Sequence, residues 1–417
     1  MNKREFLRGV GGCSVAALLG PTAWSRWARL EPRELARAEE FWSELRGKYR
    51  LTDEYVNLEN GYYSMMAQPV LETFVERVRE VNFEASRYMR TRAESERSAT
   101  RAALARLAGC PVEELALTRN TTESLDLVIA GHDWKAGDEA VMAEQDYGTM
   151  LAMFDQQARR HGIVCRRVSV PLHPRSDDEL VELYARAIGE RTRLLMVSHM
   201  INITGQILPV AKIAAMAHSK GVAVMVDGAH TFAHLDFKLP ELDCDYYGAS
   251  LHKWLGAPLG AGLLWVRKER IAKLWPLLAP PPGRAEGDIA RLNHLGTHPA
   301  HTDLALRAAI EFHEALGAAR KQERLRHLQR YWTSRVRGRP RIVLNTPEAP
   351  ERSCAIANVG IEGLPPAELA RRLLDEHRIL TVAIDSAGVR GVRVTPHVYT
   401  SEAELDQFVA ALLALAA

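Results

Sequence analysis

Val222-Ala223-Val224-Met225-Val226-Asp227-Gly228-Ala229-His230 is a hydrophobic run that ends in a carboxylate. Such a run is typical of a buried parallel strand, whose last residue lies at the edge where α/β proteins bind ligands. Similar runs recur at 115–118, 139–142, 164–170, 192–198, 244–249 and 262–266. Stretches with helical apolar spacing separate most of them. This alternation predicts an α/β fold with a mostly parallel central sheet and helices on both faces.

A proline-rich break at 276–283 ends this region of alternating strands and helices. Beyond it, apolar spacing predicts two long helices, at 302–318 and 321–335. Short strands at 341–344, 354–359 and 391–394 and a helix at 365–376 are expected to complete a compact α+β unit. We therefore expect an N-terminal segment and large domain over 26–285 and a small C-terminal α+β domain over 286–417. A chain of 417 residues, 47% of them hydrophobic, is long enough for both.

The first 25 residues are predicted to form an export signal. Basic residues precede a weakly apolar run at 9–20, which is too short to span a bilayer. Lys3-Arg4-Glu5-Phe6-Leu7-Arg8 resembles the twin-arginine export motif, with a lysine in place of the first arginine. This resemblance implies export of the folded protein to the periplasm without stable membrane insertion. The alternative is an amphipathic N-terminal helix of a cytoplasmic protein.

Charge and cysteine usage narrow the functional classes. The 54 Lys and Arg residues nearly balance the 52 Asp and Glu residues, and no dense basic block occurs, so a nucleic-acid partner is not expected. Five cysteines are scattered without a CxxC pair or the spacing of metal ligands. They are expected to be small buried hydrophobic residues, and no metal site is predicted.

Ser250-Leu251-His252-Lys253-Trp254-Leu255-Gly256 follows a strand-like run and contains the main candidate for chemistry. A lysine in isolation is most often a solvated surface residue. The apolar neighbours of Lys253 would desolvate its ammonium group and lower its pKa, which leaves a neutral amine able to attack an aldehyde. Ser250 and His252 could add hydrogen-bond donors for a phosphate.

Two upstream segments could complete such a site. Asp227 could pair with a protonated pyridine nitrogen, or it could simply cap the next helix, while His230 could hydrogen-bond a phenolic oxygen. The segment 120–124 follows a strand and opens a helix, where backbone N–H groups and the hydroxyls of Thr121 and Thr122 could bind an anion. An ordinary helix start, with Asn120 as the cap, would have a similar sequence.

In this order, the motifs resemble the class V aminotransferase-like pyridoxal-phosphate enzymes of fold type I, over nearly all of the chain after the signal. This group includes cysteine desulfurases, kynureninases and isopenicillin N epimerase-like proteins. The matching motifs are Asn120-Thr121-Thr122-Glu123-Ser124, Ser198-His199-x-x-Asn202-x-x-Gly205, Val226-Asp227-Gly228-Ala229-His230, Ser250-x-His252-Lys253, Gly296-Thr297 and Arg393-x-Thr395-x-x-x-Tyr399.

The resemblance implies pyridoxal 5'-phosphate as the cofactor, linked to Lys253 as a Schiff base. Lys253, Asp227 and His230 would be the catalytic residues, with Asp227 on the ring nitrogen and Lys253 as the proton shuttle. The phosphate would be bound by a set of polar side chains, with one of them supplied by the partner subunit of a homodimer. The set is Thr121, Thr122, Ser250, His252 and, from the partner subunit, Thr297.

Three further roles follow from the resemblance. Tyr147 would stack on the pyridine ring; otherwise it is a half-buried loop tyrosine. Asn202 would hydrogen-bond the ring oxygen or the substrate; otherwise it is an ordinary turn residue. Arg393 would clamp the α-carboxylate of the substrate through its planar fork of N–H donors, unless it only joins a surface salt bridge.

The cofactor by itself does not name the reaction, because it supports transamination, racemisation, decarboxylation and elimination. Residues 381–389, where desulfurases of this group carry a nucleophilic cysteine, contain none, so desulfurase activity is not expected. The remaining pattern resembles the isopenicillin N epimerase-like branch, and with the export signal it is similar to the periplasmic pyridoxal-phosphate enzymes that tailor pyoverdine siderophores.

We therefore expect an exported enzyme that acts at the Cα of an amino acid or an amino-acid-derived side chain and modifies a secondary metabolite. Two alternatives stay open. One is a protein that binds the cofactor without turnover. The other is a cytoplasmic aminotransferase or lyase.

Overall fold

The computed structural model describes Gly20 and residues 25–417. The predicted export signal, residues 1–25, therefore lies outside the described residues apart from Gly20 and Ser25. Across the part of the chain that is described, no helix combines the length and the apolar character needed to cross a membrane.

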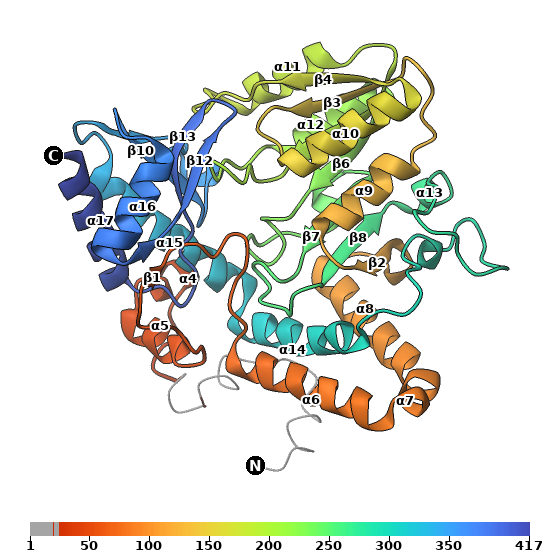
Figure 1. The fold of residues 1–417 in the computed structure, drawn as a ribbon, viewed down its shortest axis with the longest axis horizontal. Coiled ribbons are helices and arrows are strands. Elements are labelled where there is room, and N and C mark those ends of the chain that lie inside the picture. Colours follow the sequence, from red (N-terminus) through yellow and green to blue (C-terminus); the bar gives the residue numbers. More distant parts are fainter. Residues whose placement is uncertain (1–19, 21–24) are drawn as a thin grey trace.

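A seven-stranded sheet forms the centre of the larger part of the molecule (Figure 1). Its strand order is β2-β8-β7-β6-β5-β3-β4, and β8 alone among these runs antiparallel to its neighbours. The predicted mostly parallel sheet is thus confirmed. The strands are β2 (Leu115–Thr118), β3 (Glu139–Ala143), β4 (Val164–Val168), β5 (Thr192–Ser198), β6 (Ala223–Asp227), β7 (Tyr246–Ser250) and β8 (Gly262–Val266).

Helices cover both faces of this sheet, which explains why its strands are hydrophobic without alternation. In β6, Val224 and Val226 belong to one buried cluster, and Ala223 and Met225 belong to the other. Helices α11 (Asp177–Ala187) and α12 (Val210–Ser219) pack into the first cluster. Helices α9 (Thr121–Gly131) and α10 (Gly148–His161) pack into the second.

Three long helices pack together beside the sheet. They are α14 (Ala300–Leu316) and the two helices that it contacts, α6 (Gln68–Glu84) and α8 (Ala93–Ala108). The other helices outside the C-terminal cluster are short. They are α4 (Pro32–Leu35), α5 (Glu39–Arg46), α7 (Ser86–Thr91), α13 (Lys268–Ile271) and the 3₁₀ turns at Val112–Glu114, Leu239–Leu242, Ile289–Arg291 and Pro350–Arg352.

A separate four-stranded antiparallel sheet lies near the C-terminus, in the order β12-β13-β10-β9. It shares a third buried cluster with helices α15, α16 and α17. This matches the expected α+β character, while the division between domains at residue 285 remains a prediction. The elements are β9 (Ile342–Leu344), β10 (Ala357–Ile361), β12 (Val382–Ser386), β13 (Val389–Val394), α15 (Ala318–Val336), α16 (Pro366–His377) and α17 (Glu402–Ala416).

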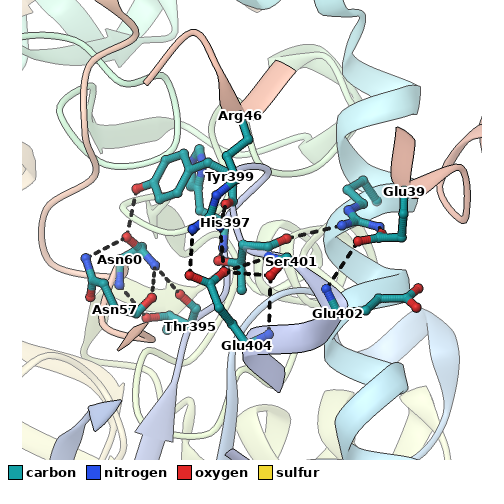
Figure 2. A network of polar contacts seen from close by, with 12 residues as sticks. Glu39, Arg46, Asn57, Asn60, Thr395, His397, Tyr399, Ser401, Glu402 and Glu404 are labelled. Carbon is teal, nitrogen blue, oxygen red and sulfur yellow. Dashed lines mark hydrogen bonds and ion pairs between the residues drawn. The ribbon is translucent and has the colours of Figure 1, made fainter. Parts of the chain in front are cut away.

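The N-terminal segment lies against this C-terminal sheet, as the red and blue elements of Figure 1 show. Strand β1 (Val56–Asn57) pairs in parallel with β11 (Ile379–Leu380). Residues 56–63, which we name the strap, continue from β1 towards the central sheet. Asn60 joins the strap to the C-terminal chain, because its side-chain amide donates to the Thr395 carbonyl (2.9 Å) and its oxygen accepts from the Tyr399 hydroxyl (2.7 Å; Figure 2).

Candidate active site

A cavity of about 320 Å³ lies at the carboxyl ends of β5, β6 and β7 and at the start of α9. Nine of the eleven residues singled out from the sequence line it, while Thr297 and Arg393 do not. The lining residues from that set are Thr121, Thr122, Tyr147, Asn202, Asp227, His230, Ser250, His252 and Lys253. The fold therefore gathers the predicted cofactor residues in one place, and their individual roles stay predictions.

Lys253 is held in the cavity by the turn that follows β7. Burial lowers the pKa of its amine to about 8, although the nearby Asp227 carboxylate acts in the opposite direction. Its Nζ lies 3.2 Å from Nε2 of His230. At neutral to mildly alkaline pH a substantial fraction of the amine is therefore uncharged, which is the form that attacks an aldehyde or accepts a proton.

His230 presents a defined tautomer to this amine. Burial, and then the charge of Lys253, hold the pKa of His230 well below its ordinary value, so its ring is neutral. The indole N–H of Trp254 donates to Nδ1 of His230 (3.4 Å), and an indole nitrogen is a donor alone. Nδ1 must therefore accept, which leaves the ring proton on Nε2, facing Lys253.

Trp254 is itself fixed by a column of rings. It stacks on His234 at 3.8 Å between ring centroids and on His397 at 5.6 Å. His397 in turn stacks on Tyr399 at 4.5 Å. The buried amine of Lys321 donates to the backbone carbonyl of Trp254. This packing sets the direction of the indole N–H and, through it, the tautomer of His230.

Asp227 ends β6 with its carboxylate in the cavity. Its Oδ1 accepts from the backbone N–H of Ala229 (2.9 Å), and burial raises its pKa. The residues after Asp227 form turns, so the helix cap considered above as an alternative is not present. A side chain at Gly228 would lie 1.9 Å from the ring of Tyr247, which explains why glycine follows the carboxylate.

The opposite end of the cavity suits an anion. Asn120 caps α9 by accepting from the backbone N–H of Glu123 (2.9 Å). The Thr121 and Ser250 hydroxyl oxygens lie 2.7 Å apart at the first turn of the helix. Nδ1 of His252 is buried and has no hydrogen-bond partner within the described residues. Hydroxyls, a helix N-terminus and an unpaired imidazole nitrogen together fit the phosphate of pyridoxal phosphate.

Arg393 lies behind the cavity lining, where it is fully buried. Its Nη2 donates to Oε1 of Glu59 (2.6 Å), and the Tyr62 ring covers its guanidinium at 4.2 Å. The ion pair is thus internal, unlike the surface salt bridge considered as an alternative. Sequence reasoning did not identify Glu59 or Tyr62, because no local pattern joins either residue to Arg393.

The remaining predicted residues are placed as follows. Tyr147 precedes α10 and is 38% exposed at the cavity mouth. Asn202 lies in the turn after β5, and its backbone carbonyl accepts from Nη1 of Arg393 (3.4 Å). Thr297 lies on an exposed loop outside the cavity of its own chain. It would need a second subunit to contribute it to a phosphate site.

Comparison with known proteins agrees with this geometry. The family described as Aminotransferase class-V matches residues 57–408. Isopenicillin N epimerase from Streptomyces clavuligerus is 30% identical over 390 residues, which cover 90% of this chain and 98% of that protein.

Solved structures share the fold. The apo cysteine desulfurase from Thermococcus onnurineus NA1 has a TM-score of 0.79 at 23% identity, covering 89% of this chain and 97% of that one. A lysine variant of C-DES with glycine covalently linked to the PLP cofactor has a TM-score of 0.80 at 24% identity, covering 88% and 98%. Together with the family match, the cavity and its lysine show that this chain belongs to the class V aminotransferase family of pyridoxal-phosphate-dependent enzymes.

Proposed function

We propose that this protein breaks a bond at the Cα of an amino acid or an amino-acid-derived side chain, with Lys253 as the base that moves the Cα proton. One observation carries the proposal: the half-buried Lys253 directs its amine, with a lowered pKa, at the N–H of His230 beside the Asp227 carboxylate. A lysine with a pKa near the working pH is suited to proton transfer in both directions.

Pyridoxal phosphate, when bound, supplies an electron sink for the charge that develops at Cα. The described residues have separate tasks around it. Asp227 would keep a proton on the ring nitrogen, and His230 would donate its Nε2 proton to the ring oxygen. Thr121, Ser250 and His252 would bind the phosphate. Desolvation of Lys253 lowers the pKa of its amine to about 8, so that a fraction of the amine is uncharged and able to accept the proton.

Epimerisation is the first reaction to test, because an isopenicillin N epimerase is similar to this chain over nearly its full length. The positions of the cysteines argue against desulfuration, which needs a reactive thiol at the site. No cysteine is among the described residues that line the cavity. Cys354 is buried, and burial raises the pKa of its thiol to about 12. Transamination and elimination begin with the same proton removal and are the alternatives.

We also propose that the active unit is a homodimer in which Thr297 reaches the phosphate of the partner subunit. The exposed position of Thr297 supports this, since it cannot serve the cavity of its own chain. Large apolar side chains stand exposed on this chain, among them Tyr63 and Leu259 at the cavity and Trp275, which is 66% exposed. A second subunit would cover such residues.

Export to the periplasm, for modification of a secondary metabolite, is part of the same proposal and rests on the N-terminal motif. Its test is cell fractionation of the full chain and of an Arg4→Lys variant. The wild-type protein should be recovered in the periplasm, and the variant should stay in the cytoplasm. Recovery of both in the cytoplasm would refute export.

The test of the reaction uses purified holoprotein. It should be yellow, lose its colour on borohydride reduction, and lose covalent cofactor attachment as Lys253→Ala. A panel of amino acids and peptides is then incubated in deuterium oxide, and exchange of the Cα proton and the configuration at Cα are followed. Exchange with inversion indicates epimerisation. Cofactor binding without exchange for any compound would support the binding-protein alternative instead.

A further inference from the structure

We propose that Glu59 is a built-in counter-ion that competes with the substrate's α-carboxylate for Arg393, so that the site selects against small free amino acids. This inference rests on the proposed role of Arg393 as the carboxylate clamp. Glu59 lies on the strap, 334 positions from its partner, and no part of the proposed chemistry uses it.

The ion pair between Arg393 and Glu59 is almost completely buried, and each partner keeps one polar atom without a hydrogen bond in the described part of the chain. Nη2 of Arg393 donates to Oε1 of Glu59 at 2.6 Å, and the same oxygen accepts from the backbone N–H of Tyr62 at 2.9 Å. Oε2 of Glu59 and Nε of Arg393 are both buried without a hydrogen-bond partner in the described part of the chain. One edge of the guanidinium fork therefore remains available to a second carboxylate.

The strap holds Glu59 in this position. Its Asn60 is anchored to the Thr395 carbonyl and the Tyr399 hydroxyl, as Figure 2 shows. A side chain at Gly61 would lie 3.2 Å from the guanidinium carbon of Arg393, so glycine lets the strap lie directly against it. The Tyr62 ring, which lines the cavity, covers one face of the guanidinium and leaves its edge uncovered.

Charge explains the selectivity. A buried arginine without a counter-ion gains a neutral pair when it binds a carboxylate. Arg393 and Glu59 already sum to zero, so an added carboxylate leaves a net negative charge in a desolvated place. A small amino acid has few other contacts to offset this cost, whereas a larger amino-acid-derived substrate has more surface to bind.

The pair also acts on the catalytic lysine. After burial and the Asp227 carboxylate, the next influences on the pKa of Lys253 are the charge of Arg393, which lowers it, and that of Glu59, which raises it. Both charges therefore lie close enough to the Lys253 amine to affect its pKa.

Glu59→Gln is the decisive change, because glutamine keeps an oxygen for Tyr62 and Arg393 and removes only the charge. The probes are aminooxyacetate and methoxyamine, two amines that react with the bound cofactor and differ by a carboxylate. The rate of the absorbance change is measured with holoenzyme for each. Glu59→Gln should raise the ratio of the aminooxyacetate rate to the methoxyamine rate at least tenfold. Glu54→Gln, an exposed control two residues before the strap, should leave it unchanged.

The methoxyamine rate reports whether the site of each variant is intact, and Glu59→Asp, which withdraws the carboxylate from Arg393, should raise the ratio by a smaller factor. A ratio that stays the same or falls in Glu59→Gln overturns the proposal, because Glu59 would then merely orient Arg393. Arg393→Gln tests the carboxylate clamp separately from the competition by Glu59. It should lower the ratio, and an unchanged ratio would refute the clamp itself.

Discussion

At the scale of single residues, Lys253 shows how the environment sets the chemistry. The pKa of its amine is lowered to about 8 because burial disfavours the ammonium form, and the Asp227 carboxylate limits that effect. The second control is the ring proton of His230, whose position follows from the indole of Trp254. Both controls can be measured on the apoprotein.

The rate at which apoprotein captures pyridoxal phosphate should rise with pH through a midpoint near 8, because the neutral amine is the nucleophile. Asp227→Asn removes the charge that favours the ammonium form, so the midpoint should fall by roughly half a pH unit or more. Stopped-flow absorbance between pH 6 and 10 measures both. A wild-type midpoint close to the ordinary lysine value would contradict the effect of burial.

Trp254→Phe should move the same midpoint upwards. Without the indole N–H, His230 can carry its proton on Nδ1 and accept from Lys253 through Nε2, which favours the ammonium form. Trp332→Phe, at another buried tryptophan, is the matched control and should leave the midpoint unchanged. If Trp254 served only as a packing residue, its variant would be slower at every pH with the same midpoint.

At the scale of elements, the strap joins the two sheets at the site. It pairs with β11 through β1, and the backbone N–H of Ser64, just beyond it, donates to the His252 carbonyl (3.3 Å). The strap therefore contacts both the C-terminal chain and the loop that carries Lys253. Its buried anchor is Asn60.

Asn60→Ala should lower the free energy of unfolding by about 2 kcal/mol, because it leaves the buried Tyr399 hydroxyl and Thr395 carbonyl short of partners. Hydrogen exchange should accelerate at residues 56–64. Asn293→Ala, which removes a single bond to the Leu117 carbonyl, should cost less and leave the strap protected. Unaltered exchange at the strap in Asn60→Ala would show that β1 alone holds it.

At the scale of the whole molecule, Lys321 links the stability of the fold to pH. Lys321 lies on α15, and its buried amine contacts the loop after Lys253. Burial lowers the pKa of this amine to about 7 from an ordinary value of 10.5. Between these values the unfolded chain binds a proton that the folded chain does not. The contribution of Lys321 to stability therefore becomes more favourable as pH rises, by up to about 1.4 kcal/mol per pH unit.

Lys321→Met should remove this dependence. Relative to the wild type, the variant should gain most at pH 7 and progressively less towards pH 10. Urea unfolding at pH 7, 8, 9 and 10 measures the difference. Lys273→Met, at an exposed lysine, should show a difference that does not change with pH. A constant difference for Lys321→Met as well would mean that the folded protein keeps the ammonium charged.

The proposed dimer predicts complementation between two impaired variants. Lys253→Ala lacks the reacting amine, and Thr297→Ala lacks the hydroxyl that would reach the partner's phosphate. Mixed dimers place both substitutions in one site and leave the other site intact, so reassembly of the mixture should restore cofactor binding and exchange activity. Sedimentation should show dimers at micromolar concentration. No recovery in confirmed mixed dimers would place Thr297 outside the shared site.

Local sequence patterns were sufficient to predict the central sheet and most of the residues that line the cavity. Strands β2, β5 and β8 have the bounds that their apolar runs predicted, and Asp227 and Lys253 stand at the expected strand ends. Local hydrophobicity and the position of a residue at a strand end depend on a short segment of sequence. They can therefore be recognised without knowing which distant segments pack against that segment. Strand β12 and helix α17 were not foreseen, because their packing is decided in the C-terminal cluster.

Tertiary structure alone decided the contacts between distant segments. The Glu59 carboxylate on Arg393, the Trp254 indole on His230 and the Lys321 amine on the Trp254 carbonyl join positions with no shared local pattern. Each depends on how the strap, the lysine loop and α15 pack together. Sequence periodicity identified the residues that can bind the cofactor, and packing decided which charges and protons they meet.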